Sequence, residues 1–159
     1  LLRDLHNYWF SVDPVQQLVV ELTERDVLQD GDQHMAEHLH FKGVQLAIDD
    51  FGTGNTSLSW LEKLRPDVLK IDRSFTSSVG IDSVNATVTD IIIALANRLH
   101  IVTVAEGVET LEQESYLRSH GVDVLQGFYY ARPMPVEAFP AWLASREESE
   151  SESESETTE

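Results

Sequence analysis

The chain has 159 residues, of which 42% are hydrophobic, and a formal net charge of −17. This length allows one sizeable core and leaves little room for a second domain. The negative charge argues against a nucleic-acid polymer or an anionic membrane surface as the main partner, because both would repel the chain. The absence of cysteine excludes disulfides and thiolate chemistry, and it fits a cytoplasmic location, although a parent protein could carry a membrane anchor.

Short apolar runs alternate with helix-periodic stretches from Val15 to Trp142, which predicts repeated βα units around a parallel sheet. The amphipathic stretch 4–10 has the pattern of the end of a further helix. The expected strands are nearly continuously apolar, which is typical of strands covered on both faces. They are residues 18–22, 44–49, 68–72, 101–106 and 122–126.

Apolar stripes and end signals predict the helices between these strands. One stripe belongs to a helix that Pro66 ends, and it consists of Leu58, Leu61 and Leu64. A second stripe consists of Val88, Ile91, Ile92, Leu95 and Leu99, and we expect both stripes to lie in the core. Thr110, followed by Gln113 three residues later, predicts a capping box that opens a helix closed by Gly121.

The last segment, residues 145–159, alternates serine and glutamate and contains no apolar residue. Such a composition cannot offset the entropy cost of ordering, so we expect a disordered acidic tail that keeps the chain solvated. The folded domain is then expected to span residues 1–144.

A polar side chain stands at or near the C-terminal end of each expected strand. Parallel α/β proteins build their active sites at this edge of the sheet. One such residue would be a packing accident more often than not, but a repeat over five strands favours a common site. The residues are Glu21, Asp49 with Asp50, Lys70, Glu106 and Gln126.

Asp49 and Asp50 are adjacent, so in a regular strand their side chains would point to opposite faces. Only where the strand breaks into the following glycine loop could both reach one cavity. Ionised carboxylates at the end of a buried strand need a cation, which predicts a divalent metal, with two ions sharing one carboxylate. The alternative is that Asp50 caps the following turn by accepting hydrogen bonds from loop amides.

Lys70 lies between Leu69 and Ile71 in a strand that is expected to be buried. An unpaired ammonium group there would lose its charge, whereas surrounding carboxylates would keep it charged. Its functional interpretation is a cation that holds an attacking water or a phosphate oxygen, and the alternative is a lysine that reaches the sheet edge to stay solvated. Glu106, which Gly107 follows directly, is a strand-end group, and Gln126 is the least specific residue of the set.

Five segments of the chain, taken in order, match the motifs of one family. They are residues 21–24 (ELTE), 49–54 (DDFGTG), 69–75 (LKIDRSF), 105–110 (AEGVET) and 126–130 (QGFYY), the last with Arg132 and Pro133. Together they resemble the EAL-domain cyclic di-GMP phosphodiesterases over roughly residues 15–142. The resemblance implies a (β/α)₈ barrel of the TIM type that hydrolyses one phosphodiester bond of cyclic di-GMP to give pGpG, with Mg²⁺ or Mn²⁺.

The resemblance also implies roles for individual residues. Glu21 and Asp49 resemble metal ligands, with Asp49 bridging to a second ion that Asp50 serves. Lys70 resembles the lysine that positions the nucleophilic water, and Glu106 the glutamate that organises this water and the second metal. The expected accessory or substrate residues are Gln126, Arg132 and Pro133. A loop that couples a homodimer to the site is expected from Phe51, Gly52, Thr53 and Gly54, with Glu24 as its anchor.

The resemblance begins at what would be the fourth strand of the barrel. The glutamate of the family's Glu-Ala-Leu motif and the asparagine ligand of the next strand have no counterpart, and both would precede Leu1. Since Leu1 is not a methionine, we expect a piece of a longer protein, to which a sensor or GGDEF domain could be attached upstream. With two ligands missing, we expect weak or absent hydrolysis from the chain alone. A barrel completed by another chain and an inert remnant stay open as alternatives.

Two other classes of function compete with this interpretation. One is a non-catalytic EAL-like module that binds cyclic di-GMP or a protein partner without hydrolysis. The other is an enolase-like metal-dependent barrel enzyme, in which a strand-end lysine acts as a base. The DDFGTG and KIDRSF segments favour the phosphodiesterase, because a count of carboxylates cannot separate the two enzymes.

Overall fold

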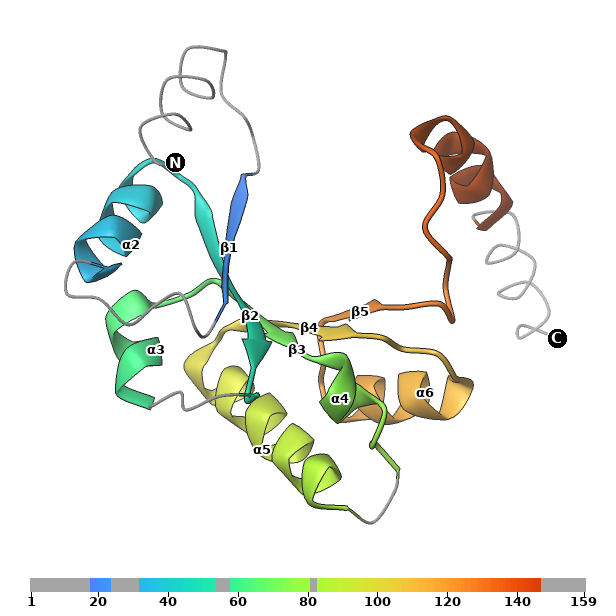
Figure 1. Ribbon diagram of the computed structural model, residues 1–159, viewed down its shortest axis with the longest axis horizontal. Coiled ribbons are helices and arrows are strands. Elements are labelled where there is room, and N and C mark those ends of the chain that lie inside the picture. The colour runs from blue at the N-terminus through green and yellow to red at the C-terminus, as the bar shows by residue number, and fades with distance from the viewer. Residues whose placement is uncertain (1–17, 24–31, 54–57, 81–82, 147–159) are drawn as a thin grey trace, which may run out of the picture.

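The computed structural model describes residues 18–23, 32–53, 58–80 and 83–146 (Figure 1). The expected helix at residues 4–10 and the candidate residues Glu24 and Gly54 lie outside this part of the chain. The described residues form one sheet of five parallel strands in the order β1-β2-β3-β4-β5. The strands are β1 (Val19–Thr23), β2 (Gln45–Phe51), β3 (Val68–Ile71), β4 (Val102–Glu106) and β5 (Val124–Gln126).

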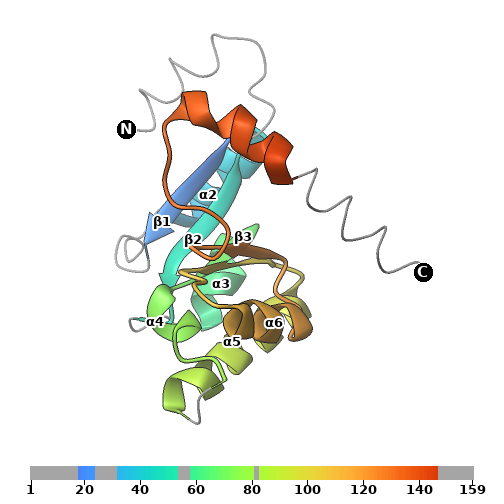
Figure 2. The same cartoon turned by 90° about the vertical axis from the view of Figure 1, so that its right-hand side faces the viewer.

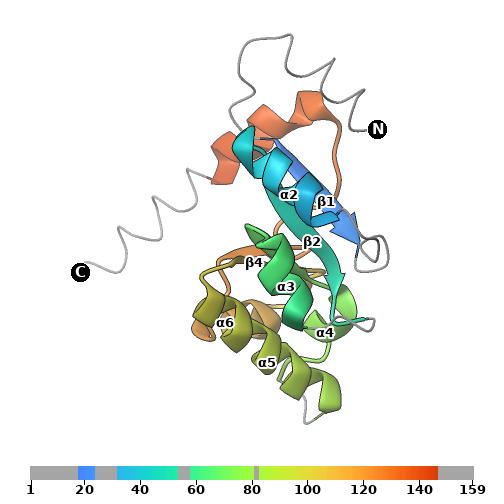
Figure 3. The same ribbon diagram turned by 90° about the vertical axis from the view of Figure 1, so that its left-hand side faces the viewer.

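The helices connect successive strands and gather on the outer side of the curved sheet (Figures 1 and 3). They are α2 (Asp32–Phe41), α3 (Leu58–Leu64), α4 (Arg73–Thr76), α5 (Val84–Leu99) and α6 (Leu111–Ser119), followed by the 3₁₀ turn η1 (Val136–Ala138). The predicted βα architecture is confirmed. The described strands run in order from β1 to β5 without a pairing between these two, so the sheet does not close into a barrel. None of the described helices is long and apolar enough to cross a membrane.

The core lies between the helices and one face of the sheet. In β3, Leu69 and Ile71 are fully buried, whereas Lys70 on the opposite face is only partly buried. Val102 and Val124 also lie on the opposite face, with 43% and 47% of their surface exposed. The expectation that both faces are covered is therefore wrong for the described sheet. A continuous apolar run indicates that the side chains on both faces of a strand could be buried. The described helices, however, cover only one face of this sheet.

The predicted strand positions agree with the structure to within about two residues, and the last strand is the shortest. Asp123, expected to lie within that strand, instead precedes β5, and its carboxylate accepts hydrogen bonds from the Thr103 backbone N–H and hydroxyl, both at 2.8 Å. Asp67 has the same position before β3. Its carboxylate accepts a 2.8 Å hydrogen bond from the Leu46 backbone N–H. The two aspartates thus join the starts of neighbouring strands.

The helix stripes are confirmed in part. Leu61 and Leu64 of α3 are buried, and the side chain of Leu58 lies outside the described part. In α5, Ile92 is buried, but Ile91 and Leu99 are 61% and 48% exposed, so their assignment to the core is wrong. The reason is geometric. Three consecutive isoleucines span more than half of the helix circumference, and the buried side of α5 is set by Thr89, Ile92, Ile93 and Ala96.

The capping box at the start of α6 is confirmed. The Thr110 hydroxyl accepts a hydrogen bond from the Gln113 backbone N–H, and the Gln113 side chain accepts one from the Thr110 N–H in return. The helix ends at Ser119, and Gly121 follows with a φ of 85°. This positive φ favours glycine, as the sequence indicated.

The chain continues after η1 into a helix over residues 139–146, which Figure 2 shows at the top of the molecule. Arg146 in its last turn donates a 2.8 Å hydrogen bond to the Tyr130 carbonyl. Ser145 and Arg146, the first two residues of the expected tail, are therefore helical. Residues 147–159 lie outside the described part, so disorder there stays a prediction.

Candidate active site at the carboxyl ends of the strands

Three carboxylates from three strands converge on one ammonium group. The Lys70 Nζ atom in β3 lies 2.7 Å from Glu106 Oε1, 3.0 Å from Glu21 Oε2 and 3.1 Å from Asp49 Oδ1. Only 12% of the Lys70 side chain is exposed. The structure therefore brings four of the predicted site residues together on adjacent strands, at the edge where the sequence predicted a common site.

The alternation of the strands explains why these residues meet. Side chains two residues apart in a strand point to the same face. Lys70 therefore shares the partly exposed face of β3 with Val68, and Glu106 shares the same face of β4 with Val104. The β2 strand departs from regular pairing between Ile48 and Phe51, directly around Asp49. Such irregularities change the direction of a side chain at a strand end.

The carboxylates keep Lys70 charged. Burial alone would lower the pKa of Lys70, but the hydrogen bonds to Glu106, Glu21 and Asp49 outweigh it and raise the pKa well above the usual lysine value. The alternative of a lysine that extends to the sheet edge to stay solvated does not describe this side chain. The ammonium group is a fixed positive charge at neutral pH.

Asp50 lies outside this cluster. It is exposed, has a φ of 56°, and its backbone N–H donates a 3.1 Å hydrogen bond to Asp49 Oδ1. The following turn is closed by the Asp50 carbonyl, which accepts hydrogen bonds from the Thr53 N–H and hydroxyl at 3.2 and 2.9 Å. Among the described residues the turn is closed by the backbone carbonyl of Asp50. The loop amides of residues 54–57 lie outside the described part, so capping by the Asp50 carboxylate stays an alternative. Its role as a ligand of a second metal stays a prediction.

The remaining accessory candidates do not join the cluster either. Gln126 is exposed at the end of β5, where its Cα pairs with that of Glu106. The Arg132 guanidinium lies over the Phe128 ring, 4.5 Å from the ring centroid, and both Arg132 and Pro133 are exposed. Their accessory roles stay predictions.

The segment expected to couple a dimer to the site begins inside the core. Phe51 is buried in β2. Gly52 follows with a φ of 93°, and a Cβ atom there would lie 3.0 Å from Ile92 and 3.1 Å from Phe75. Glycine is therefore required for both backbone and packing reasons. Thr53 is exposed, and the coupling role of the segment stays a prediction.

One contact beside the cluster was missed by the sequence interpretation. Arg73, just after β3, forms a 2.8 Å ion pair with Glu109, which follows β4. Both residues stand within family-like segments, but neither lies at a strand end. The spacing rule that found the other site residues therefore could not find them.

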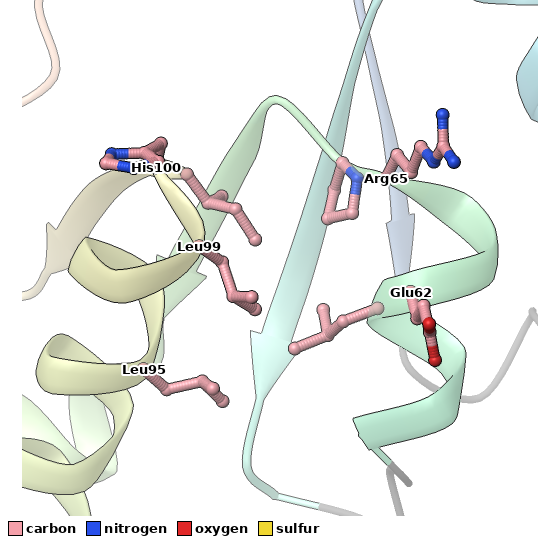
Figure 4. Close-up of a pocket in the computed structure, with 8 residues that line it drawn as sticks. Glu62, Arg65, Leu95, Leu99 and His100 are labelled. Carbon is pink, nitrogen blue, oxygen red and sulfur yellow. The ribbon is translucent and has the colours of Figure 1, made fainter.

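A hollow lies at the other end of the sheet from the Lys70 cluster, between α3 and α5 (Figure 4). It has a volume of about 560 Å³, and its lining includes Ile101 and Pro66, which precede β4 and β3. Figure 4 shows Leu95 and Leu99 pointing into it while Arg65 and His100 turn away. The lining is mainly apolar, and its polar members are Glu62, Arg65 and His100.

The donor chemistry of the Lys70 cluster fits a hard divalent cation, since carboxylate oxygens are the ligands that Mg²⁺ and Mn²⁺ prefer. The arrangement is incomplete, however. Within the described ranges, no group of three His, Asp or Glu side chains is placed to hold an ion. The carboxylates of Glu21, Asp49 and Glu106 face the ammonium group instead.

Comparison with known proteins places the chain in a family. The model of the EAL domain matches residues 2–133. The chain belongs to the EAL domain family. Over 144 residues it is 66% identical to the probable cyclic di-GMP phosphodiesterase PdeD of Escherichia coli (strain K12), a match that covers 91% of this chain and 27% of PdeD. The enolase-like alternative is therefore wrong.

Solved EAL structures show the same fold. The PaMucR phosphodiesterase in its c-di-GMP complex has a TM-score of 0.80 and 39% identity, over 87% of this chain and 57% of that chain. The manganese/cyclic di-GMP complex of Klebsiella pneumoniae BlrP1 at pH 6 has a TM-score of 0.66 and 36% identity, over 72% of this chain and 30% of that chain. The chain thus spans little more than half of the PaMucR chain and corresponds to part of an EAL barrel.

Proposed function

We propose that this chain supplies catalytic residues of a cyclic di-GMP phosphodiesterase, which hydrolyses one phosphodiester bond to give pGpG. The observation that carries the proposal is the convergence of Glu21, Asp49 and Glu106 on Lys70 at the carboxyl edge of the sheet. The similarity to the probable cyclic di-GMP phosphodiesterase PdeD and to the cyclic di-GMP complexes of PaMucR and BlrP1 supports it.

The fixed charge of Lys70 suits it to this reaction. Hydrolysis forms a bond from a water oxygen to phosphorus, breaks the bond to a ribose oxygen, and places negative charge on the phosphoryl oxygens. An ammonium group held in place by carboxylates can stabilise that charge or hold the water without reorganising. Glu106, the nearest partner of Lys70 at 2.7 Å, would orient the same water.

Mg²⁺ or Mn²⁺ is the proposed cofactor, and the manganese complex of BlrP1 supports this choice. Glu21, Asp49 and Asp50 would hold the ions through carboxylate oxygens. When bound, such ions lower the pKa of water and neutralise phosphoryl charge. The glutamate and asparagine expected upstream of Leu1 would complete the ligand set, so the isolated chain should hydrolyse weakly or not at all.

Release of pGpG tests this proposal. Cyclic di-GMP is incubated with Mn²⁺ and either this chain, an intact EAL domain, or a longer form of the chain that carries the two upstream ligands. We expect turnover from the longer form, little from the chain alone, and a large loss in either when Lys70 is changed to Met. Turnover by the isolated chain equal to that of an intact domain would contradict the fragment proposal. A longer form that neither binds nor hydrolyses cyclic di-GMP would contradict the function.

A second candidate is a regulatory module that binds cyclic di-GMP without hydrolysis. It is favoured by one observation, that in the described part the carboxylates pair with Lys70 and form no three-ligand group for a metal. Binding that persists without turnover after neutralisation of Lys70 or Glu106 would support it. A homodimer, an upstream sensor or GGDEF domain and a cytoplasmic location stay predictions in either case.

A further inference from the structure

The four residues that begin with Glu106 are held from the β3 side by Arg73. Its Nη2 atom lies 2.8 Å from Glu109 Oε1. Its aliphatic stem crosses directly over Gly107, where a Cβ atom would lie 2.8 Å from Arg73 Cβ, 2.9 Å from Cδ and closer still to Cγ. Gly107, with a φ of 70°, therefore lets the arginine stem lie against the backbone just after Glu106.

The same segment is held from the β5 side by backbone contacts. The Val108 N–H donates a 3.0 Å hydrogen bond to the Gln126 carbonyl, and the Val108 carbonyl accepts one of 3.0 Å from the Tyr129 N–H. A Cβ atom on Gly127 would lie 2.6 Å from the carbonyl carbon of Val108 and closer to its nitrogen and oxygen. Val108 is fully buried. This side of the segment is fixed by packing that leaves no free space.

These contacts help to set the distance between Glu106 and Lys70. Arg73 follows Lys70 by three residues, and Gly107 and Glu109 follow Glu106 by one and three. Lys70 in β3 and Glu106 in β4 form the closest ion pair of the cluster. Arg73 therefore links the segment that follows β3 to the segment that follows β4. Val108 is fixed on its other side, and Arg73 contacts the same segment from the β3 side.

We propose that Arg73 is a positioning residue, which holds Glu106 at its place beside Lys70 by lying over Gly107 and pairing with Glu109. The inference rests on the proposed phosphodiesterase function of this cluster. The Arg73 and Glu109 side chains are 62% and 40% exposed, so their ion pair adds little to global stability. Arg73 acts on the position of Glu106, whereas a merely structural residue would act on the stability of the whole domain.

The first test reads the position of Glu106 without activity. The ¹³C shift of the Glu106 carboxyl group and the amide exchange of residues 107–109 are measured by NMR in the chain and in two variants. Arg73→Ala removes stem and charge, whereas Arg73→Met keeps most of the stem. We expect a moved Glu106 signal and roughly tenfold faster exchange in Arg73→Ala, with a smaller change in Arg73→Met.

The matched control is Arg118→Ala. Arg118 also forms an ion pair, 2.6 Å from Glu114, with 65% of its own side chain and 16% of the Glu114 side chain exposed, but it lies on α6. We expect similar unfolding free energies for Arg73→Ala and Arg118→Ala and no movement of the Glu106 signal in the control. An unmoved Glu106 signal in Arg73→Ala, or a movement of the same size in Arg118→Ala, would overturn the inference.

The second test uses a form of the protein that releases pGpG. A displaced Glu106 should lower kcat of Arg73→Ala about tenfold or more with KM little changed, since small misplacements of catalytic groups are costly. A rise in KM with kcat unchanged would assign Arg73 to substrate contact and overturn the positioning role. If the phosphodiesterase proposal itself fails, no variant turns over, and the NMR comparison still decides the role of Arg73.

Discussion

The Lys70 ammonium group lies closer to Glu106, at 2.7 Å, than to either of its other two carboxylate partners. These two residues come from adjacent strands, β3 and β4, whose Cα pairing places Lys70 opposite Val104. The contact is thus a diagonal one at the end of the sheet. The partners on the other side come from β1 and β2, so one cation balances acids from three strands.

Removing this cation should destabilise the fold. Lys70→Met leaves three carboxylates close together without a positive charge, and we expect a loss of about 2–3 kcal/mol at neutral pH, reduced from the value for fully buried pairs because Glu21 is half exposed. Urea unfolding in metal-free buffer measures it. Lys63→Met, on the exposed side of α3, should change stability by less than about 0.5 kcal/mol. Equal stability of Lys70→Met and the unchanged chain would contradict the expectation.

The contribution of Lys70 should depend on pH only in alkaline solution. Its pKa is raised in the folded state, so the folded state binds this proton more tightly than the unfolded chain does. The stabilisation is then complete below the ordinary lysine pKa of about 10.4 and is lost as pH rises through the higher folded value. The difference in unfolding free energy between the chain and Lys70→Met, measured over pH 7 to about 11, should stay constant and then shrink. A decline below pH 9 or so would mean that the ammonium loses its proton near neutrality.

Asp72 should confer stability that is lost in acid. It is the N-cap of α4, where its carboxylate accepts a 2.9 Å hydrogen bond from the Ser74 N–H. Burial by itself would raise the pKa of Asp72, but hydrogen bonds from Ser74 and the Arg73 backbone outweigh this and lower it. The stabilisation is therefore present above the ordinary aspartate pKa and disappears as pH falls through the lower folded value.

Two substitutions distinguish the contribution of the Asp72 capping hydrogen bond from that of its negative charge. Asp72→Ala should cost about 1 kcal/mol at neutral pH, whereas Asp72→Asn keeps a capping oxygen that does not titrate. Thermal unfolding from about pH 6 down to about pH 3 should show the advantage of aspartate over asparagine shrinking with falling pH. An advantage that grows in acid would reverse the sign of the argument.

Gly127→Ala should be far more damaging than a typical glycine substitution. The new Cβ atom would meet the Val108 backbone, which is held by hydrogen bonds and cannot withdraw. We expect a loss of more than about 3 kcal/mol in the free energy of unfolding. Gly43→Ala provides the comparison, because Gly43 has a φ of 75° but no atom within 4 Å of a new Cβ. Only backbone strain of about 1–2 kcal/mol is then expected, and similar losses in the two variants would contradict the steric argument.

The sequence was most informative where local pattern alone decides the structure. The strand positions, the capping box at Thr110 and the grouping of Lys70 with acidic strand ends could all be predicted, because alternation in a strand fixes which side chains share a face. The apolar neighbours Leu69 and Ile71 indicated that Lys70 would stay charged only if carboxylates surrounded it, and the structure supplies three.

Other features depend on contacts between distant segments. The exposure of Ile91 is decided by which side of α5 meets the sheet, and three consecutive isoleucines do not determine that side. The position of Asp50 depends on a local irregularity of β2, and the reach of Arg73 across Gly107 depends on the spacing between two loops. Neither has a period or a spacing that could be read from the chain.

The two ends of the sheet are stabilised by different interactions, hydrogen bonds at the amino ends of the strands and ion pairs at the carboxyl ends. At the amino ends, Asp67 and Asp123 bond directly to the backbone of Leu46 and Thr103, and these bonds fix strand register. At the carboxyl ends, the acids are balanced by a single lysine. Register is therefore set at the end of the sheet opposite the Lys70 cluster. Substitutions around Lys70 should therefore change the charge of this edge without shifting the strand register, which the aspartates hold at the opposite end.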